Sequence, residues 1–292
     1  MPEFDLVVQA PALAPAAIDA FAAACLADEV RRRPGAARLR GIDGGPETRR
    51  VVAALARYWN CDAALVPARR RGSDFRLLVM DMDSTLITIE GIDELARLAG
   101  KGAEVAAITA SAMRGEIPDY AQSLQRRVAL LAGADAGLCQ RVIDERLRLS
   151  PGAAALLAGA RALGWHSVLV SGGFTVFAEH VRNALGIDTA WANELGVDHG
   201  RLSGSVRGPA FNDGQILDGM AKARALREHC AALGCSGAQA IAIGDGANDL
   251  EMMAAAGLSV AYRAKPVVKA RADLSLDHSA LDAVLSLFAD RW

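Results

Sequence analysis

Two aspartates that follow a short apolar run have the spacing to do chemistry at one point. Asp81 and Asp83 come directly after Leu77-Leu78-Val79-Met80, a run with the length and composition of a buried strand. Side chains alternate along an extended chain, so both carboxylates can point at one spot beyond the strand's end. In open α/β sheets that spot is where ligands bind. A simple turn is the alternative, because Asp and Ser often bind backbone amides after strands.

A second acidic turn follows another apolar run. Residues 238–243 are typical of a strand, and Gly244-Asp245-Gly246-Ala247-Asn248-Asp249 leads from it into a predicted helix over 250–256. If the two strands are neighbours, the two turns bring their carboxylates together. Clustered like charges need a cation to coexist, and oxygen ligands in this number suit Mg²⁺. Each turn could instead cap a helix.

Two further features suit an anionic ligand. Ser171-Gly172-Gly173 joins a predicted strand over 166–170 to a helix over 175–185, which leaves backbone amides free to point at an anion. Lys222 lies in a predicted helix over 218–233. A tight connection and a solvated surface charge are the respective alternatives. No GxxxxGK[ST] loop is present, so this is not a P-loop protein.

If the two acidic turns, the Ser-Gly-Gly segment and Lys222 lie together at one edge of the sheet, they predict phosphoryl-transfer chemistry. Asp81 at the strand tip is suited to be a nucleophile, since carboxylates can form an aspartyl-phosphate. Asp83 is suited to protonate the leaving oxygen and later to deprotonate water. Mg²⁺, Lys222 and the amides near Ser171 would neutralise the transferring group, where most of the catalysis of phosphoryl transfer lies.

The order of these motifs resembles a known family. DMDSTLI, SGGF, a downstream lysine and GDGAND are similar to the haloacid-dehalogenase-like phosphatases. Within that family, ITIEGIDELA, ASAMRG with AQSLQRRVALL, and VSGGFTVFAEH resemble the phosphoserine phosphatase branch of bacteria more closely. The resemblance covers about Leu77 to the C-terminus, whereas the preceding residues match only loosely, in length and position.

The resemblance implies roles for individual residues. It makes Asp81 the nucleophile and Asp83 the acid and base. It implies that Mg²⁺ is held by Asp81, the backbone carbonyl of Asp83, and Asp245, with Asp249 supporting the site. It further implies that the phosphate-binding groups and their neighbour in the pocket are Ser171, Gly172, Lys222 and Asn248.

The resemblance also implies how a substrate is selected. Glu90 would contact the ammonium of a phosphorylated amino acid, Arg127 its carboxylate, and Met113 its apolar part. One anion and one fork-shaped cation match a zwitterion. Judged without the resemblance, these three residues pass for a helix-start acid, a surface arginine and a core side chain. Tyr120 stands where the family often has Phe, which puts the apolar seal of the lid in doubt.

The expected function is therefore the Mg²⁺-dependent hydrolysis of O-phosphoserine to serine and phosphate, the last step of serine biosynthesis. A related enzyme acting on another small phosphorylated amino acid, such as phosphohomoserine, is one alternative. An amino-acid-sensing protein with an inactive phosphatase fold is another. The intact acidic motifs and Lys222 argue against the sensor, because loss of Asp81 would be the expected mark of an inactive enzyme.

The elements that position these residues form three parts. Residues 1–72 predict a small α+β unit, with strands over 4–9, 37–41 and 62–67, helices over 15–26 and 46–59, and a turn over Arg31–Gly35. This alternation is compatible with a regulatory, ACT-like module. Residues 69–73 are typical of a linker.

The remaining residues predict an α/β core with an insertion. Residues 73–90 and 150–292 alternate strands and helices, as in a Rossmann-like parallel sheet, and end in a helix from Ser279. Residues 91–149 contain four helical patterns without a convincing strand, and we expect them to form a cap. Such an insertion can act as a lid that excludes water, although a plain helical extension is the alternative.

The amino-acid composition of the chain narrows the classes of binding partner that we expect. The 292 residues are 52% hydrophobic and 23% charged, with a net charge of −2, so nothing favours nucleic acid or an anionic membrane. No apolar run resembles a membrane span, and the acidic N-terminus argues against a signal peptide. Five cysteines without a CxxC motif indicate free thiols in a reducing cytoplasm. We expect a cytoplasmic protein with a small-molecule substrate; a homodimer is left open.

Overall fold

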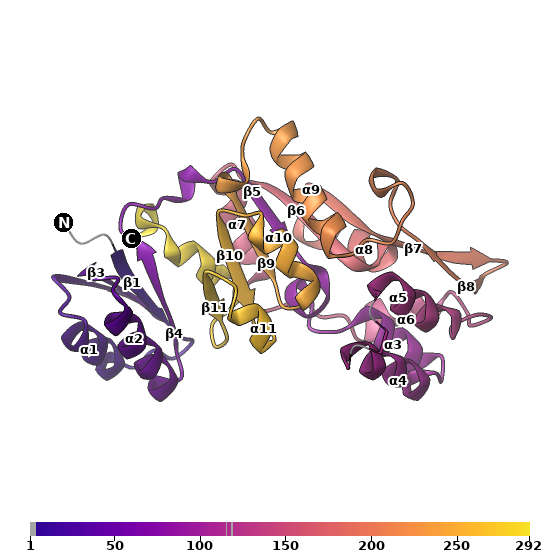
Figure 1. Ribbon diagram of the computed structural model, residues 1–292, viewed down its shortest axis with the longest axis horizontal. Coiled ribbons are helices and arrows are strands. Elements are labelled where there is room, and N and C mark those ends of the chain that lie inside the picture. The colour runs from indigo at the N-terminus through magenta and orange to yellow at the C-terminus, as the bar shows by residue number, and fades with distance from the viewer. Residues whose placement is uncertain (1–3, 115, 118) are drawn as a thin grey trace.

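The computed structural model describes residues 4–292 except 115 and 118. Two sheets organise the chain, one of four strands and one of seven. Figure 1 shows the four-stranded sheet with its helices at one end of an elongated molecule, the seven-stranded sheet in the middle, and the helices α3–α6 at the other end.

The four-stranded sheet is antiparallel, in the order β2-β3-β1-β4. Its chain order is β1 (Phe4–Gln9), α1 (Pro15–Ala24), β2 (Glu29–Arg33), β3 (Ala36–Ile42), α2 (Pro46–Trp59) and β4 (Asp62–Pro67). Both helices begin with proline, which lacks the N–H that would be unpaired there. This β-α-β-β-α-β order is the ferredoxin-like arrangement, with a core of its own around Leu6, Phe21 and Leu39.

One sequence-based prediction in this part was wrong. Residues 31–35 were expected to form a turn, but Glu29–Arg33 forms the edge strand β2, and only Pro34 and Gly35 turn. The three arginines indicated a loop because their side chains are polar. An edge strand tolerates them, since its charged side chains reach solvent and discourage pairing with another chain.

The seven-stranded sheet has the order β11-β10-β9-β5-β6-β7-β8. All neighbouring pairs are parallel except β7 and β8, which form an antiparallel hairpin. The strands are β5 (Leu77–Met80), β6 (His166–Phe174), β7 (Thr189–Asp198), β8 (Arg201–Arg207), β9 (Ala240–Gly244), β10 (Leu258–Tyr262) and β11 (Leu274–Leu276). A parallel sheet of this kind confirms the predicted Rossmann-like α/β class.

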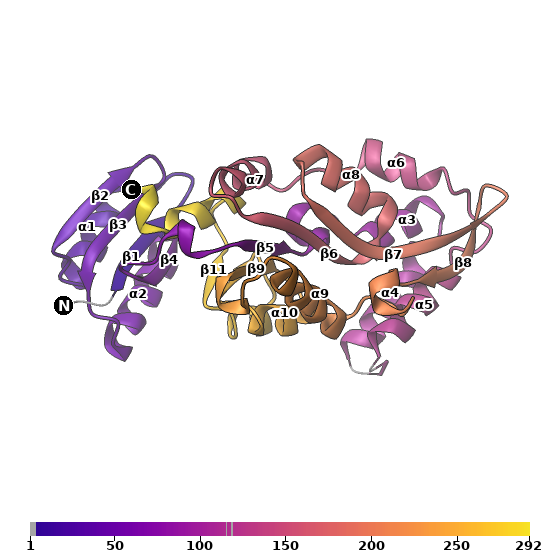
Figure 2. The same ribbon diagram turned by 90° about the horizontal axis from the view of Figure 1, so that it is seen from above.

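Helices cover both faces of this sheet, as Figure 2 shows. They are α7 (Ala153–Ala162) and α8 (Thr175–Leu185) on one face, and α9 (Gly219–Ala232) and α10 (Leu250–Ala254) on the other, with the short α11 (Pro266–Lys269) packing beside the latter pair. The alternation within β5 explains this arrangement: Leu78 and Met80 belong to one buried cluster, Leu77 and Val79 to the other. A strand buried on both faces is apolar throughout.

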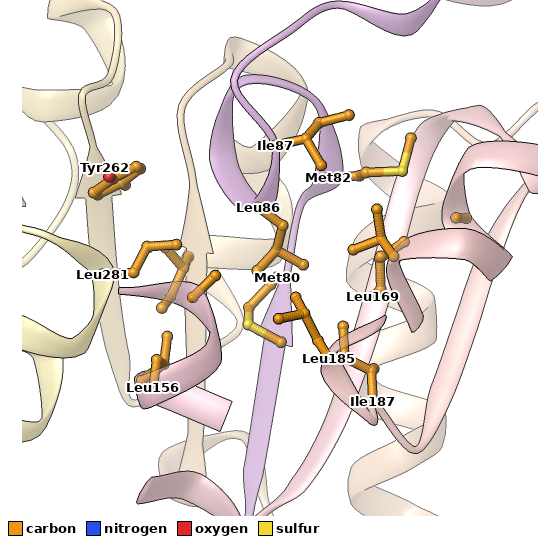
Figure 3. Close-up of a cluster of buried hydrophobic side chains, with 14 of the residues drawn as sticks. Met80, Met82, Leu86, Ile87, Leu156, Leu169, Leu185, Ile187, Tyr262 and Leu281 are labelled. Carbon is orange, nitrogen blue, oxygen red and sulfur yellow. The ribbon is translucent and has the colours of Figure 1, made fainter. Parts of the chain in front are cut away.

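The larger of these clusters runs beneath the carboxyl end of β5. Figure 3 shows Met80 among Leu156, Leu169 and Leu185, with Met82 above it. All five side chains are buried, so the end of β5 is held in place on a packed base.

Four helices are inserted between β5 and α7. They are α3 (Gly91–Leu98), α4 (Gly102–Met113), α5 (Tyr120–Ala129) and α6 (Leu138–Glu145). The two crossings of the chain lie side by side, because the amide of Ser150 donates to the carbonyl of Leu86 at 2.9 Å and that of Thr88 to Arg148 at 3.0 Å. The far side of the insertion is also attached: the amide of Gly133 donates to Leu202 on β8 at 2.8 Å.

The C-terminal segment differs from its prediction. A helix was expected from Ser279. Instead, the chain that follows β11 forms 3₁₀ turns over Leu281–Leu287 and Ala289–Arg291. The segment lies against the four-stranded sheet (Figure 1). There Asp62 accepts the amide of Ser279 at 2.7 Å, and Arg38 donates to the carbonyl of Leu287 at 3.3 Å. Tertiary partners for its backbone groups replace the bonds of a regular helix. Among the helices of residues 4–292 that are described, none combines the length and apolarity of a membrane span.

Candidate active site

The two acidic turns lie next to each other. β5 lies between β6 and β9, and Met80 is in register with Leu169 and Ile243. Because these strands are parallel, their carboxyl ends meet at one edge of the sheet. The amide of Asp81 donates to the carbonyl of Ile243 at 3.0 Å, which ties the first turn directly to the strand that precedes the second.

Lys222 joins the two turns. Its Nζ donates to Asp81 Oδ1 at 2.6 Å and to Asp249 Oδ1 at 2.7 Å, and its side chain is 0% exposed. Burial acts to lower the pKa of Lys222, but the charges of Asp249 and Asp81 outweigh it and raise that pKa above its ordinary value. The lysine therefore stays protonated. Lys222 is therefore not a solvated surface charge, which was the alternative left open by the sequence.

Asp249 organises the second turn. Its Oδ2 accepts the amides of Asp245 at 3.1 Å and Gly246 at 2.9 Å, while its Oδ1 accepts from Lys222. Both of its oxygens thus have donors within the protein. Asp249 is therefore suited to support neighbouring ligands rather than to be one.

Asp81, Asp245 and Asp249 form a group that could hold a metal ion. One carboxylate oxygen of each lies within 4.8 Å of the others. Burial raises the pKa of Asp81 well above its ordinary value, and the charge of Asp249 adds to the rise. Burial and then Asp249 likewise raise the pKa of Asp245 to about 6. These acids resist ionising together, which a hard cation with oxygen ligands such as Mg²⁺ would relieve, so the donor set fits it.

Asp83 has an environment of its own. It lies in the turn Met82–Leu86, where Ser84 adopts φ +55° and reverses the chain. The amide of Gly91 donates to Asp83 Oδ1 at 3.1 Å. Burial, followed by the charge of Glu90, raises the pKa of Asp83 to about 8. A carboxyl of this kind holds a proton at neutral pH and can act as a general acid.

Ser171, Gly172 and Gly173 were expected to connect a strand to the next helix, but they form part of β6 itself, which continues to Phe174. This segment is held from two sides. Asn193 Nδ2 donates to the carbonyl of Gly172 at 2.8 Å, and the Tyr120 hydroxyl donates to the same oxygen at 3.2 Å. Burial raises the pKa of Tyr120 to about 12, so it remains a neutral donor. A Cβ at Gly172 would collide with the Tyr120 hydroxyl, and one at Gly173 would lie 2.6 Å from Asp83 Oδ2, so a larger residue at either position would displace a side chain of the site.

One cavity, with a volume of about 560 Å³, lies between the sheet edge and the cap. Most of the residues singled out from the sequence line it: Asp81, Asp83, Glu90, Arg127, Ser171, Gly172, Asp245 and Asn248. Lys222 is buried beneath Asp81 rather than on the wall. Met113 ends α4, but its side chain lies outside the described part of the chain.

Several residues of this site were missed at the sequence level. Asn193 is 0% exposed and bridges the Gly172 carbonyl to the amide of Leu217, which donates to its Oδ1 at 2.8 Å. Thr85 Oγ1 donates to Asp245 Oδ1 at 3.1 Å. Asp93 and Lys265 line the cavity. The position of Thr85 within DMDST was a signal for its role, whereas Asn193 lies within β7 and belongs to no distinctive motif.

Comparisons with known proteins identify related sequences and structures. A family model described as haloacid dehalogenase-like hydrolase matches residues 78–254. The chain is 51% identical over 215 residues to a phosphoserine phosphatase of Polaromonas sp., which covers 74% of this chain and 90% of that protein.

Two solved structures are similar over nearly the whole chain. A haloacid dehalogenase-family hydrolase of Salmonella enterica serovar Typhi has a TM-score of 0.86 at 27% identity, covering 99% of both chains. A probable phosphoserine phosphatase of Vibrio cholerae, in unliganded form, has a TM-score of 0.80 at 34% identity, covering 98% of this chain and 88% of the other.

Proposed function

This chain belongs to the haloacid dehalogenase-like hydrolases, and from that premise we propose that it hydrolyses O-phosphoserine to serine and inorganic phosphate. One observation carries the proposal. A single cavity is lined by the acid pair Asp81 and Asp83 and by the oppositely charged Glu90 and Arg127. The first pair suits phosphoryl transfer, and the second suits a zwitterionic amino acid.

Metal binding would use the carboxylates at the strand ends. Asp81 and Asp245 would hold Mg²⁺ together with the backbone carbonyl of Asp83, while Asp249 would orient Asp245 through its amide. When bound, Mg²⁺ supplies positive charge that offsets the negative charge of the phosphoryl group.

In the first half-reaction, a carboxylate oxygen of Asp81 attacks the phosphorus atom. The bond from phosphorus to the serine oxygen breaks, and Asp83 donates its proton to that oxygen, so serine leaves neutral at its hydroxyl. The product on the protein is an aspartyl-phosphate at Asp81. Lys222 holds the Asp81 carboxylate in place and remains charged throughout.

In the second half-reaction, Asp83 accepts a proton from water as the water oxygen attacks phosphorus. The bond to Asp81 breaks, which releases inorganic phosphate and restores the carboxylate. Asp83 ends protonated, ready for the next turnover. During both steps Ser171 and Gly172 would bind the phosphate oxygens, and Asn248 lies on the wall of the same cavity. Lys222, expected among the phosphate-binding groups, would act from beneath Asp81 by adding positive charge near the transferring group.

The cap selects the substrate. Glu90 would bind the ammonium and Arg127 the carboxylate, the latter as a bidentate pair. Met113 would contact the apolar part of the substrate. Tyr120, bound to the Gly172 carbonyl, would close the cavity beside the phosphate.

We extend the proposal to the setting of the enzyme. Residues 1–72 would be a separate domain, residues 73–90 and 150–292 the catalytic core, and residues 91–149 the cap. The ferredoxin-like order of the first part supports a regulatory, ACT-like role, with a homodimer left open. The reaction would take place in the cytoplasm as the last step of serine biosynthesis.

The test is phosphate release from O-phosphoserine with Mg²⁺ and with EDTA, alongside phosphohomoserine and a sugar phosphate. We expect Mg²⁺-dependent turnover that is highest with O-phosphoserine. Faster turnover of phosphohomoserine would assign the enzyme to a neighbouring specificity. Equal turnover of the sugar phosphate would remove the roles of Glu90 and Arg127, and no turnover of any of the three would contradict the function.

A further inference from the structure

The cap wall of the cavity carries one acid to which no role has yet been assigned. Asp93 lines the cavity together with Glu90 and Arg127. Glu90 precedes α3 as its N-cap residue, and Asp93 lies in the first turn of that helix. Asp93 and Glu90 therefore come to the cavity from the same end of α3.

Glu90 is already engaged toward the base of the cavity. Its Oε1 accepts a hydrogen bond from Ser84 Oγ at 2.7 Å. Its charge contributes to the raised pKa values of Asp83 and Asp245, so its carboxylate lies close to the catalytic acids. In this position, Glu90 alone leaves the space nearer to the cap without an anion.

Asp93 is a second acid of the cavity that lies near Arg127. Although Asp93 is an exposed residue, desolvation of its carboxyl raises its pKa, and the positive charge of Arg127 is the next largest influence and opposes the rise. Arg127 comes from α5, where its Nε donates to the carbonyl of Ser123 at 3.3 Å. Both side chains line the cavity, and among the ion pairs of the described residues none joins Asp93 to Arg127, so the two charges lie near each other without direct contact.

We propose, on the basis of the function proposed above, that Asp93 is a second binding residue for the substrate ammonium, near Arg127. The zwitterionic head of the substrate then lies between the two, with its carboxylate on Arg127 and its ammonium shared by Asp93 and Glu90. An ammonium has three N–H donors, so two carboxylates can bind it at once. The arrangement sets each head-group charge against an opposite charge of the protein, which rejects substrates that lack either charge.

The experiment measures kcat and KM of the full-length enzyme with Mg²⁺ on three phosphomonoesters. O-phosphoserine carries both head-group charges, phosphoethanolamine lacks the carboxylate, and 3-phosphonooxypropanoate lacks the ammonium. With Asp93→Asn, we expect kcat/KM to fall about tenfold for the two substrates with an ammonium, the size expected for one charge-assisted hydrogen bond, chiefly through KM. The third substrate should change by less than about twofold on the same basis.

Matched variants separate this role from a structural one. Glu94 is the adjacent acid and pairs with Arg97 on the cap surface, so Glu94→Gln should leave all three rates unchanged. Asp93→Glu keeps the charge and should recover part of the loss. Asp93→Ser keeps a side chain suited to a first helical turn without the charge, and should repeat the pattern of Asp93→Asn.

Three outcomes would overturn the inference. Equal losses on all three substrates would mean that Asp93 only supports the cap. Losses confined to the two carboxylate-bearing substrates would mean that it positions Arg127 instead. If the wild type hydrolyses O-phosphoserine and Asp93→Asn has no effect, this role is refuted while the proposed function stays intact. If the wild type does not hydrolyse O-phosphoserine, the function itself is refuted.

Discussion

Lys222 Nζ lies 2.6 Å from Asp81 Oδ1, although 141 residues separate them in the chain. The same ammonium binds Asp249 Oδ1 at 2.7 Å, so one buried cation joins three segments: the end of β5, the helix α9 and the turn after β9. A buried charge is tolerated only when it is paired. The position of Asp81 therefore depends on a contact that neither acidic motif contains.

Replacing Lys222 tests this contact. Lys222→Met removes the cation and leaves Asp81 and Asp249 buried without their partner, which should cost about 3–5 kcal/mol in the free energy of unfolding. Turnover should be lost as well. Urea unfolding in EDTA measures the first effect and phosphate release with Mg²⁺ the second.

Lys269→Met is the control for that experiment. Lys269 pairs with Asp277 at 2.7 Å, but about a third of each side chain is exposed. Loss of such a pair should cost about 1 kcal/mol or less and leave turnover unchanged. Equal destabilisation by the two variants would contradict the importance assigned to the buried contact.

Asp81→Asn tests the nucleophile. The amide cannot attack phosphorus to form the acyl phosphate, so turnover should be abolished. Because the variant removes one negative charge from the group with Asp245 and Asp249, its Tm in EDTA should equal or exceed that of the wild type. Asp144→Asn, on the surface of the cap, should alter neither quantity. Residual steady turnover by Asp81→Asn would exclude this residue as the nucleophile.

Arg127→Ala tests recognition of the carboxylate. We expect kcat/KM on O-phosphoserine to fall roughly 10- to 100-fold, the range for loss of a charged hydrogen-bonding partner, with little change on phosphoethanolamine. Arg126 is the matched control, because it is the preceding residue of α5 but is exposed and does not line the cavity. Unchanged preference for O-phosphoserine over phosphoethanolamine would rule out this role for Arg127.

The raised pKa values of Asp83, to about 8, and Asp245, to about 6, predict how stability varies with pH. Without metal, the folded state binds protons at these carboxyls more tightly than the unfolded state, whose carboxyls titrate near 3.8. Stability should therefore be greatest near pH 4 and fall as the pH rises toward 8. Mg²⁺ favours the ionised carboxylates and should reduce this fall.

Thermal unfolding in EDTA and in Mg²⁺, from pH 4 to 8.5, measures this dependence. Asp245→Asn removes one of the titrating groups. The Tm of this variant minus that of the wild type should therefore increase as the pH rises from 4 to 7. A constant difference between the two proteins over that range would mean that Asp245 titrates alike in the folded and unfolded states.

Much of the secondary structure of this protein could be predicted from local sequence patterns. The apolar runs before DMDST and GDGAND predicted β5 and β9, and the periodicity of residues 91–149 predicted four inserted helices. Local pattern also misled: Arg31–Arg33 resembled a turn but pairs as an edge strand, and the segment after Ser279 resembled a helix but binds the four-stranded sheet through 3₁₀ turns. In both cases partners distant in sequence decided the conformation.

The sequence by itself determined which side chains could do chemistry and that apolar strands precede the two acidic motifs, because residue types and the spacing of apolar positions are local properties. Only the tertiary structure decided that β5 lies between β6 and β9, that Lys222 reaches Asp81, that Asn193 holds the Gly172 carbonyl, and that Asp93 and Arg127 line one cavity. These relationships depend on strand order and on the packing of helices against the sheet. Contacts between residues far apart in the chain form only when the whole core is assembled.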